Sequence, residues 1–565
     1  MLSAIRDIGR LVIKKTMKIE RPIEGKILVI NVNSYNYAGI HIEDFDSGKI
    51  EQYLYKEGES KGNNPAPFCP LTEPKKTLKK ISNWLKQCRE VKIDDFSLNV
   101  SEILNILINE ENQIITELLQ SIQNIPKNIN MFFTIKINGK FLGEYEVFRK
   151  CFLQLKEKKL KKSANIGVCS ICGETGKEVS GKIDVFKFYT IDKPGFIAGG
   201  FKEIDAWKNY PVCMNCKSDL ERGRKFLESN LNFKFYGLNY LLIPQLLVGG
   251  EYLFEEIIEI LSETKKTIAL RERIKKKITD DEKEILEYLS KKTDVVVFNF
   301  LFLQKQQSAE RILLLIEDVL PSRIRKIFDA KDYVDTVFQN NQDRGFTFGT
   351  IRTFFSKSSE DKRQNDLDKY FLEIINSVFK GKKINFSFLV KLLMTGIRRE
   401  LTKDPQESKF NFRVKDALMS ILFFERLNII SFEEEGAMSE SIFDNIFTKY
   451  GKSLSTSAKR GIFLLGVLTQ LLLNKQWSER NAKPFIKKLK GLKMDEKDIK
   501  ALLPEVQNKL EEYEAFDKGK QILAQEISKY FLEAGDNWNM SVDEINFYFA
   551  CGMNLADEVV KIIYK

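Results

Sequence analysis

Two cysteine pairs constrain the fold of this chain more than any other feature of its sequence. Cys169-Ser-Ile-Cys172 and Cys213-Met-Asn-Cys216 are both C-x-x-C motifs, with 40 residues between Cys172 and Cys213. Two such pairs can place four thiolates around one zinc ion, and Gly173 suits the tight turn after the first pair. Four cysteine ligands leave no open coordination position. We therefore predict a structural Zn²⁺ held by Cys169, Cys172, Cys213 and Cys216.

Two other interpretations of these cysteines remain open at this point. They are two unrelated thiol pairs, or a redox-active C-x-x-C motif, although one redox motif would not need a second pair. The remaining cysteines, Cys69, Cys88, Cys151 and Cys551, are scattered and show no disulfide framework. Such cysteine usage fits a reducing, cytoplasmic compartment.

The length of the chain predicts several domains. A chain of 565 residues is too long for one core, and its 43% hydrophobic content is that of a globular protein. We expect an α+β multidomain protein: an N-terminal mixed α/β domain with a zinc-bound insertion, a mostly helical middle region and an all-α C-terminal bundle. The expected boundaries give residues 1–165, 166–250, 251–400 and 401–565.

Local patterns place the main strands and helices. Lys26–Val32 and Tyr37–Phe45 predict a hairpin, and Asn138-Gly139 predicts a second hairpin between Met131–Ile137 and Phe141–Phe148. Helical spacing dominates residues 71–125. In the middle region Asp294–Leu303 predicts a buried strand and Glu310–Val319 an apolar helix. From about residue 400 to the end we expect only helices, with Ile462–Leu473 central in a bundle.

The basic residues are more informative by position than by number. The net charge of +11 is a modest excess on a chain of this size. However, Arg149–Lys162 and Lys265–Lys277 each carry seven Lys or Arg and one acid, so either run could neutralise phosphates or form a solvated surface. The segment between the cysteine pairs could present Lys193, Phe196 and Lys202 to nucleic acid, or it could pack on neighbouring domains.

Several function classes are disfavoured by what the sequence lacks. His41 is the one histidine, and its alternating surroundings predict an exposed strand position rather than a catalytic or metal-binding role. The sequence contains neither G-x-x-x-x-G-K-[ST] nor a G-x-G-x-x-G placed between a strand and a helix. It also shows no secretory signal and no apolar stretch long enough to span a bilayer. We expect no enzyme activity and no membrane association.

Several runs together resemble one family, the large subunit of the type I-B CRISPR interference complex (Cascade). The zinc region carries most of the resemblance, and the middle and both ends add to it. The matching runs are Cys169–Cys172, Phe186-Lys-Phe-Tyr-Thr190, Asp192-Lys-Pro-Gly-Phe196, Trp207-Lys-Asn209, Pro211–Cys216, Tyr240–Pro244, Leu314–Arg323, Gly39–Glu43, Tyr53–Tyr55 and Asn546–Met553.

The resemblance implies a non-catalytic subunit of an RNA-guided surveillance complex. Guide RNA pairing then reads the target sequence, and the large subunit recognises a short protospacer-adjacent motif on double-stranded DNA. The resemblance further implies help in unwinding the target and recruitment of a separate helicase–nuclease. The implied partners are crRNA, the target duplex, and the backbone, crRNA 5′-end-binding and small subunits.

Two finer hypotheses follow from this resemblance. A loop with Lys61, Asn63 and Asn64, together with the zinc-region loop, would contact the motif duplex, because Asn pairs with base edges and Lys anchors phosphates. The C-terminal bundle would resemble the complex's small subunit. It could also be made separately from an internal start at Met419 or Met438.

Two alternatives remain beside the RNA-guided complex. One is a free-standing zinc-containing DNA- or RNA-binding protein, which should bind nucleic acid alone with a steep salt dependence. The other is a metal-dependent nuclease that uses carboxylates such as Asp94, Asp95, Asp280 and Asp281. Those acids sit in polar stretches, where solvated side chains are the better interpretation.

Overall fold

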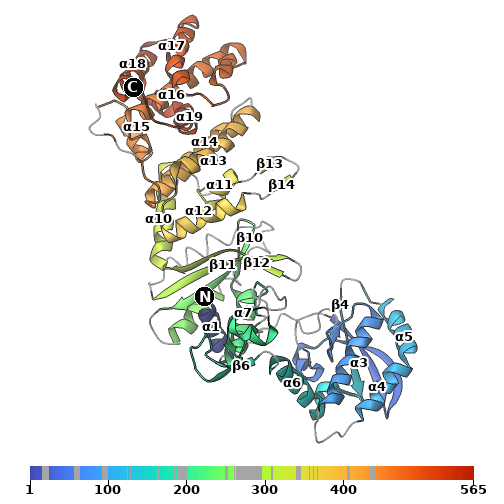
Figure 1. The fold of residues 1–565 in the computed structure, drawn as a ribbon. Helices are drawn as coiled ribbons and strands as arrows, with labels where there is room; N and C mark the ends of the chain where they lie inside the picture. Colours follow the sequence, from blue (N-terminus) through green and yellow to red (C-terminus); the bar gives the residue numbers. More distant parts are fainter. Residues whose placement is uncertain are drawn as a thin grey trace. The chain divides into compact units, whose positions relative to one another are not determined.

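A computed structural model describes most of the chain, and its contacts divide the chain into two compact units. One unit holds residues 2–226, and the other holds Met1 and residues 227–565. Each unit is described by itself below (Figure 1). The described residues are 1–14, 25–55, 64–91, 99–123, 125–126, 129–161, 164–181, 183, 185–188, 200, 202–247, 252–259, 261–262, 295–306, 309–338, 345–355, 357–359, 362–364, 367–403, 408–432, 435 and 440–564.

A mixed sheet organises most of the first unit. Its strand order is β2-β1-β4-β3, with β5 paired to β4. The predicted first hairpin is confirmed, and β1 also runs parallel to β4, with Leu28 opposite Phe133. The strands are β1 Gly25–Asn33, β2 Asn36–Asp44, β3 Cys69–Pro70, β4 Asn130–Ile137 and β5 Lys140–Phe141.

Alternation along β1 and β4 gives this sheet two buried faces. Leu28, Ile30 and Phe133 pack with helices α3, α4 and α5, whereas Ile27 and Val29 on the opposite face pack with an aromatic cluster that contains Tyr53 and Phe68. The helices of this part are η1 Ser47–Lys49, α2 Ile50–Tyr53, α3 Pro74–Glu90, α4 Val100–Asn109, α5 Glu111–Gln123, η2 Leu142–Glu144 and α6 Glu146–Lys161.

The second predicted hairpin is wrong in its length. The turn at Asn138-Gly139 exists, but only Lys140 and Phe141 pair with β4. The Glu144 carboxylate accepts a hydrogen bond from the Phe141 N–H at 2.6 Å. This local bond caps η2 and turns the chain towards α6, so Tyr145–Phe148 does not extend the strand.

Residues 164–226, together with the first helix, complete this unit. The strands β6 Ala164–Gly167, β7 Lys177–Ser180 and β8 Val212–Cys213 form a three-stranded sheet in that order. The helices are α1 Leu2–Lys14, η4 Glu203–Lys208 and α7 Met214–Asn230, whose last residues enter the second unit.

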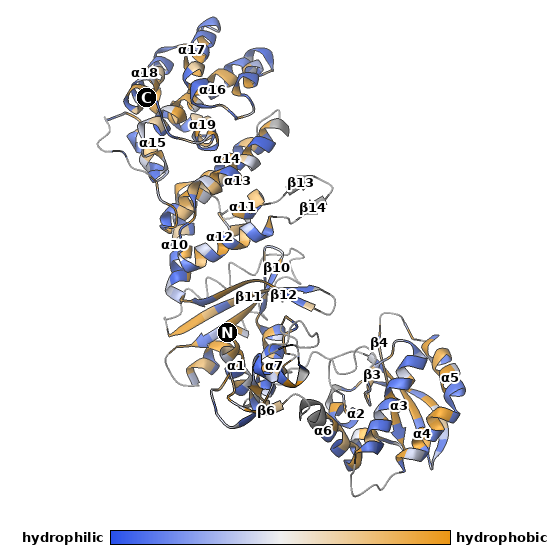
Figure 2. Ribbon diagram, in the orientation of Figure 1, coloured by the Kyte–Doolittle hydropathy of each residue, from blue (hydrophilic) through white to orange (hydrophobic). Residues whose placement is uncertain are grey.

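The second unit begins with an antiparallel sheet of order β12-β11-β10-β9. Of the strand predicted at Asp294–Leu303, residues 296–303 lie in β11 as predicted, and Asp294 lies outside the described residues. The helix predicted at Glu310–Val319 is wrong, because this segment is β12. Its pairing with β11, for example Ile316 opposite Phe300, satisfies the backbone of an apolar run that has no decisive periodicity of its own. The strands are β9 Asn232–Phe235, β10 Leu238–Leu246, β11 Val296–Gln306 and β12 Ala309–Val319. In Figure 2 this sheet carries both hydrophobic and hydrophilic colour.

The Leu-Pro-Ser-Arg run after β12 has a structural role. Pro321 occupies the first turn of α10, where a missing N–H costs nothing. Arg323 donates from Nε to the Val378 carbonyl at 2.9 Å, close to Gly381, the left-handed C-cap of α12. One of the most specific runs of the resemblance therefore joins two helices of this unit.

The rest of the second unit is almost entirely helical in the part that the structure describes. After residue 400 the described residues form only helices and their connections, as predicted, and the expected boundary at 400/401 falls within α13. Met419 is buried within α14, and Met438 lies outside the described residues. The elements are α10 Pro321–Val337, α11 Phe348–Arg352, η6 Thr353–Phe355, β13 Lys357–Ser359, β14 Lys362–Gln364, α12 Asp368–Lys380, α13 Phe386–Lys403, α14 Ser408–Arg426, α15 Asp444–Lys449, η7 Lys452–Leu454, α16 Ser457–Arg480, η8 Pro484–Leu489, α17 Glu496–Glu512, α18 Lys518–Ala534, α19 Val542–Asn554 and α20 Ala556–Ile563.

Helix α16 is the centre of the C-terminal helices, as its continuous apolar run predicts. Ile462 to Leu468 are buried on every side of the helix, against α18 and α19 among others. Across the described helices, none is both long and apolar enough to cross a membrane.

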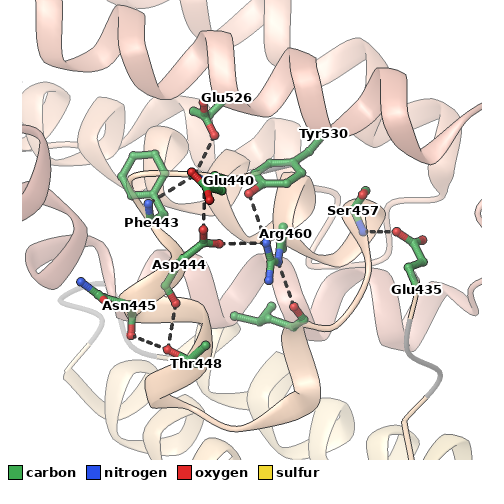
Figure 3. Close-up of polar contacts among 12 residues, drawn as sticks. Glu435, Glu440, Phe443, Asp444, Asn445, Thr448, Ser457, Arg460, Glu526 and Tyr530 are labelled. Carbon is green, nitrogen blue, oxygen red and sulfur yellow. Dashed lines mark hydrogen bonds and ion pairs between the residues drawn. The ribbon is translucent and has the colours of Figure 1, made fainter. Parts of the chain in front are cut away.

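A buried arginine attaches the segment before α16 to this bundle (Figure 3). Arg460 donates to the Asp444 carboxylate at 3.0 Å, to the Leu454 carbonyl at 3.2 Å and to the Tyr530 hydroxyl at 3.4 Å. Its guanidinium also lies 4.6 Å from the ring centroid of Phe447. A buried cation with these four contacts fixes α15 and η7 against α16 and α18.

Candidate metal centre

The four predicted cysteines converge on one point. Their Sγ atoms all lie within 4.8 Å of one another, and no other such group of His, Cys, Asp or Glu occurs among the residues that the structure describes. A tetrahedral zinc site with Zn–S distances of about 2.3 Å requires sulfur atoms about 3.8 Å apart. The four thiols therefore fit a metal ion with little movement.

The first cysteine pair sits in a turn between β6 and β7. The Gly173 N–H donates to the Cys169 carbonyl at 2.8 Å, and Gly173 has a φ of +73°, which a side chain would disfavour. The Ser170 N–H donates to the Pro211 carbonyl at 2.8 Å. This bond holds the turn against the segment that leads to the second pair.

The second pair joins a strand to a helix. Cys213 ends β8, opposite Val179 of β7, and Cys216 lies in the first turn of α7. The Cys213 N–H donates to the Cys169 sulfur at 3.3 Å. The turn between β6 and β7 and the junction of β8 with α7, which are separated by 40 residues between Cys172 and Cys213, therefore supply the two halves of the site.

Burial and hydrogen bonding change the pKa of the Cys169 and Cys216 thiols in opposite directions. Burial opposes ionisation of Cys169, but backbone N–H groups of Cys213, Cys172 and Ile171 outweigh it and lower the pKa of the Cys169 thiol to about 7. Burial and the neighbouring Cys213 raise the pKa of Cys216 above its ordinary value. A bound dication would lower the pKa of all four thiols and so favour four thiolates.

The N-terminal helix supports the metal centre, which the sequence patterns did not reveal. Arg6 of α1 donates from Nη1 to the Ile171 carbonyl at 3.1 Å, inside the first cysteine turn. Arg10 donates to the Asp219 carboxylate at 3.0 Å, one turn along α7 from Cys216, and this bond raises the pKa of Arg10. Asp219 is only 6% exposed and also accepts from Arg222.

Two glycines allow α1 and α7 to approach closely. A Cβ on Gly9 would lie 1.9 Å from the Asp219 carbonyl oxygen, and one on Gly223 would lie 2.0 Å from that of Ile5. Both distances are shorter than any real contact. Both glycines are visible in the sequence. Their role in close helix packing can be recognised only once α1 is seen to cross α7.

Replacing Asp219 by alanine should weaken this support. It leaves Arg10 and Arg222 without their shared carboxylate, and a lost charged hydrogen bond costs about 1.5–3 kcal/mol. We expect a lower unfolding temperature and faster loss of bound zinc to a chelator. Asp205→Ala is the matched control, since Asp205 pairs only with Lys208 on its own short helix in the described structure. Equal zinc loss from the two variants would contradict the role assigned to α1.

The predicted nucleic-acid residues are only partly described. Asn64 is exposed just before β3, and Lys202 is exposed at the start of η4. Lys61, Asn63, Lys193 and Phe196 lie outside the described residues, as do Asp94, Asp95, Asp280 and Asp281. In the segment between the cysteine pairs, Phe186 stacks on Phe188 and lies under the guanidinium of Arg224, so these two aromatic residues are part of the packing.

Family comparisons identify the class of protein. The chain matches three domain descriptions in order, all of which are CRISPR-associated. It belongs to the family of CRISPR-associated protein TM1802 (cas_TM1802), whose N-terminal domain matches residues 1–154, whose central domain matches residues 166–319 and whose C-terminal domain matches residues 346–565. No curated protein matches the chain. The central match contains all four cysteines and ends where β12 ends.

Proposed function

We propose that this chain is the large subunit of a type I-B CRISPR surveillance complex. In that role it recognises the protospacer-adjacent motif on double-stranded DNA, helps to unwind the target and recruits a separate helicase–nuclease in the cytoplasm. The observation that carries the proposal is the ordered match of all three domains of a CRISPR-associated family along one chain. The runs of the resemblance are distributed over the same three domains.

Zinc is the metal that the proposal assigns to the four cysteines. Soft thiolate ligands in a closed, tetrahedral set favour zinc and leave no position for a substrate. The ion would hold the β6–β7 turn against the start of α7 and so position both ends of the segment that carries Lys193, Phe196 and Lys202. Its role would be structural.

The chain itself is proposed to be non-catalytic. Its single histidine, His41, contacts Asn31 at 2.5 Å and also contacts Glu43, so its ring is occupied by neighbours within the sheet. The lysine of β4, Lys136, forms an ion pair with the same Glu43. These contacts support a structural role for the histidine, and target cleavage would fall to the recruited helicase–nuclease.

Recovery of guide RNA with the chain tests this proposal. We expect that a tagged chain, purified gently from its own host, carries short RNAs that share one repeat-derived end, together with backbone, crRNA 5′-end-binding and small subunits. The measurement is RNA sequencing and mass spectrometry of the same preparation. The preparation should also leave labelled DNA uncut when magnesium or manganese is added without the helicase–nuclease.

Two comparisons make the result decisive. A host that lacks the repeat array should yield the chain without these RNAs, which excludes non-specific RNA. A wild-type preparation that is free of RNA and partner subunits but binds DNA would favour a free-standing nucleic-acid-binding protein. Metal-dependent cleavage that Cys213→Ser retains and an acidic-residue variant loses would favour the nuclease.

A further inference from the structure

Helix α3 presents an almost wholly basic face to solvent. Its buried side packs into the core of the sheet through Leu78, Ile81, Trp84, Leu85 and Cys88. Figure 2 shows both hydrophilic and hydrophobic colour along α3, and Glu90 at its end is the one acid among its residues. The exposed basic residues, here named the α3 basic face, are Lys75, Lys76, Lys79, Lys86 and Arg89.

The spacing of these residues aligns their charges. At about 100° per residue, Lys75, Lys79 and Lys86 fall within about 40° of one another, opposite the buried side of the helix. Arg89 and Lys76 flank this row on its two sides. With a rise of about 1.5 Å per residue, the whole α3 basic face extends over about 21 Å from Lys75 to Arg89. The result is a straight row of cations.

Most of these cations have no acidic partner within the described residues. Lys76 pairs with Glu73 at 2.6 Å, but no ion pair or hydrogen bond engages the side chains of Lys75, Lys79, Lys86 or Arg89 there. Several lysines on other helices of this chain pair with an acid of the same helix: Lys475 pairs with Glu479, Lys500 with Glu496 and Lys509 with Glu512. Four of the five cations of the α3 basic face have no such partner among the described residues.

We propose that the α3 basic face binds the phosphate backbone of double-stranded DNA. This inference rests on the proposed function and adds to it a surface that holds the duplex without reading its sequence. One strand of a duplex presents about six phosphates over about 21 Å, a charge density that a straight row of lysines complements. Because lysines contact phosphates as point charges, the binding is independent of base sequence.

The composition of the face favours a duplex over a single strand. Single-stranded nucleic acid is held by basic grooves combined with aromatic side chains on which bases stack. The one aromatic residue of α3, Trp84, is 3% exposed and packs against Phe148 in the core. Ser82 and Asn83, which lie between the lysines, offer no stacking surface.

The test neutralises the row and measures salt dependence. The complex would be purified from the host with either the wild-type chain or Lys75→Gln/Lys79→Gln/Lys86→Gln, and titrated with a duplex that has no complementarity to the guide RNA. Each lost phosphate contact reduces the slope of log Kobs against log salt by about 0.9, so the slope should fall by about 2.7. Binding at 0.1 M salt should weaken about tenfold or more.

A matched variant distinguishes the effect of the α3 lysines from the effect of a lower net charge. Lys475→Gln/Lys488→Gln/Lys509→Gln removes the same charge from lysines that pair with Glu479, Glu505 and Glu512, and it should leave the slope unchanged. Both triple variants should unfold at the wild-type temperature, because the α3 lysines are exposed and the control lysines lie on helix surfaces.

Each other outcome has one meaning. Equal slopes for the α3 variant and wild type, or equal losses in both triple variants, would overturn the inference while the proposed function stands. The same titration with single-stranded DNA completes the test: weaker binding of the α3 variant to the single strand alone, with unchanged binding to the duplex, would also overturn the inference. A wild-type preparation with neither guide RNA nor duplex binding would instead remove the proposed function, and the inference with it.

Discussion

Replacing Cys213 by serine should remove bound zinc and unfold the region around the metal centre. The hydroxyl of serine does not ionise at neutral pH, so the site would keep three thiolates and lose its closed coordination. Because metal binding to such a site is folding free energy, we expect a loss of about 4 kcal/mol or more in stability. The segment between the pairs should become protease-sensitive.

The measurements are zinc content per chain, thermal unfolding and limited proteolysis. Wild type should contain about one zinc per chain, as one four-cysteine site requires. A chelator that strips the metal from wild type should reproduce the unfolding profile of Cys213→Ser. A variant that keeps full zinc content and wild-type stability would refute the four-cysteine site.

Cys69→Ser is the matched control for this experiment. Cys69 is fully buried in β3, and burial raises the pKa of its thiol to about 12, so it is a neutral packing group. Introducing a hydroxyl there costs about 1–3 kcal/mol through an unsatisfied polar group. Zinc content should nevertheless stay at the wild-type level, which distinguishes loss of metal from loss of packing.

Alanine at Gly466 or Gly552 should destabilise the C-terminal helices strongly. A Cβ on Gly552 of α19 would lie 1.8 Å from the carbonyl oxygen of Phe463, and one on Gly466 of α16 would lie 2.1 Å from that of Phe549. Both obstacles are backbone atoms, so the helices must separate. Overpacking of this kind costs about 1–3 kcal/mol or more, against an intrinsic gain of about 1 kcal/mol for Gly→Ala in a helix.

Denaturant unfolding of the full chain, followed through the transition of its C-terminal helices, measures this effect. Gly519→Ala is the control, since its Cβ would meet the ring of Tyr564 at 2.7 Å and no backbone atom. The hydroxyl of this ring donates to Asp517 and accepts from Lys520, so the variant should lower stability, but by less than either variant at the helix crossing. The double variant Gly466→Ala/Gly552→Ala should cost less than the sum of the single variants, because both substitutions separate the same pair of helices. Additive, small effects would show that α16 and α19 do not cross at these glycines.

Both glycine crossings show where sequence patterns stop being informative. Gly9 with Gly223, and Gly466 with Gly552, read locally as weak points in good helices. The role of each glycine in packing depends on which helix lies opposite, and the partner residue is more than 80 positions away in the sequence. The same holds for Arg6, whose bond to the Ile171 carbonyl requires α1 to lie against the first cysteine turn.

The strand at Glu310–Val319 is a second case in which the local sequence pattern does not determine the structure. Its run of leucines and isoleucines suits a buried helix or a buried strand equally well. The deciding contribution is the hydrogen-bond pairing with β11, which the segment cannot make alone. By contrast, the hairpin of β1 and β2 and the helices after residue 408 have periodicities that already agree with their tertiary environment, and both were predicted correctly.

The sequence by itself determined the elements whose physics is local: the two thiol pairs with their glycine-containing turn, the strong turn signals and the helical periodicity of the C-terminal part. Only the tertiary structure decided how the pairs meet, because convergence of four sulfur atoms needs β7 beside β8 and α1 against α7. It also decided which basic residues remain available. A count of charges treats all lysines alike, whereas on α3 the fold buries the apolar side and leaves Lys75, Lys79 and Lys86 without an acidic partner among the described residues.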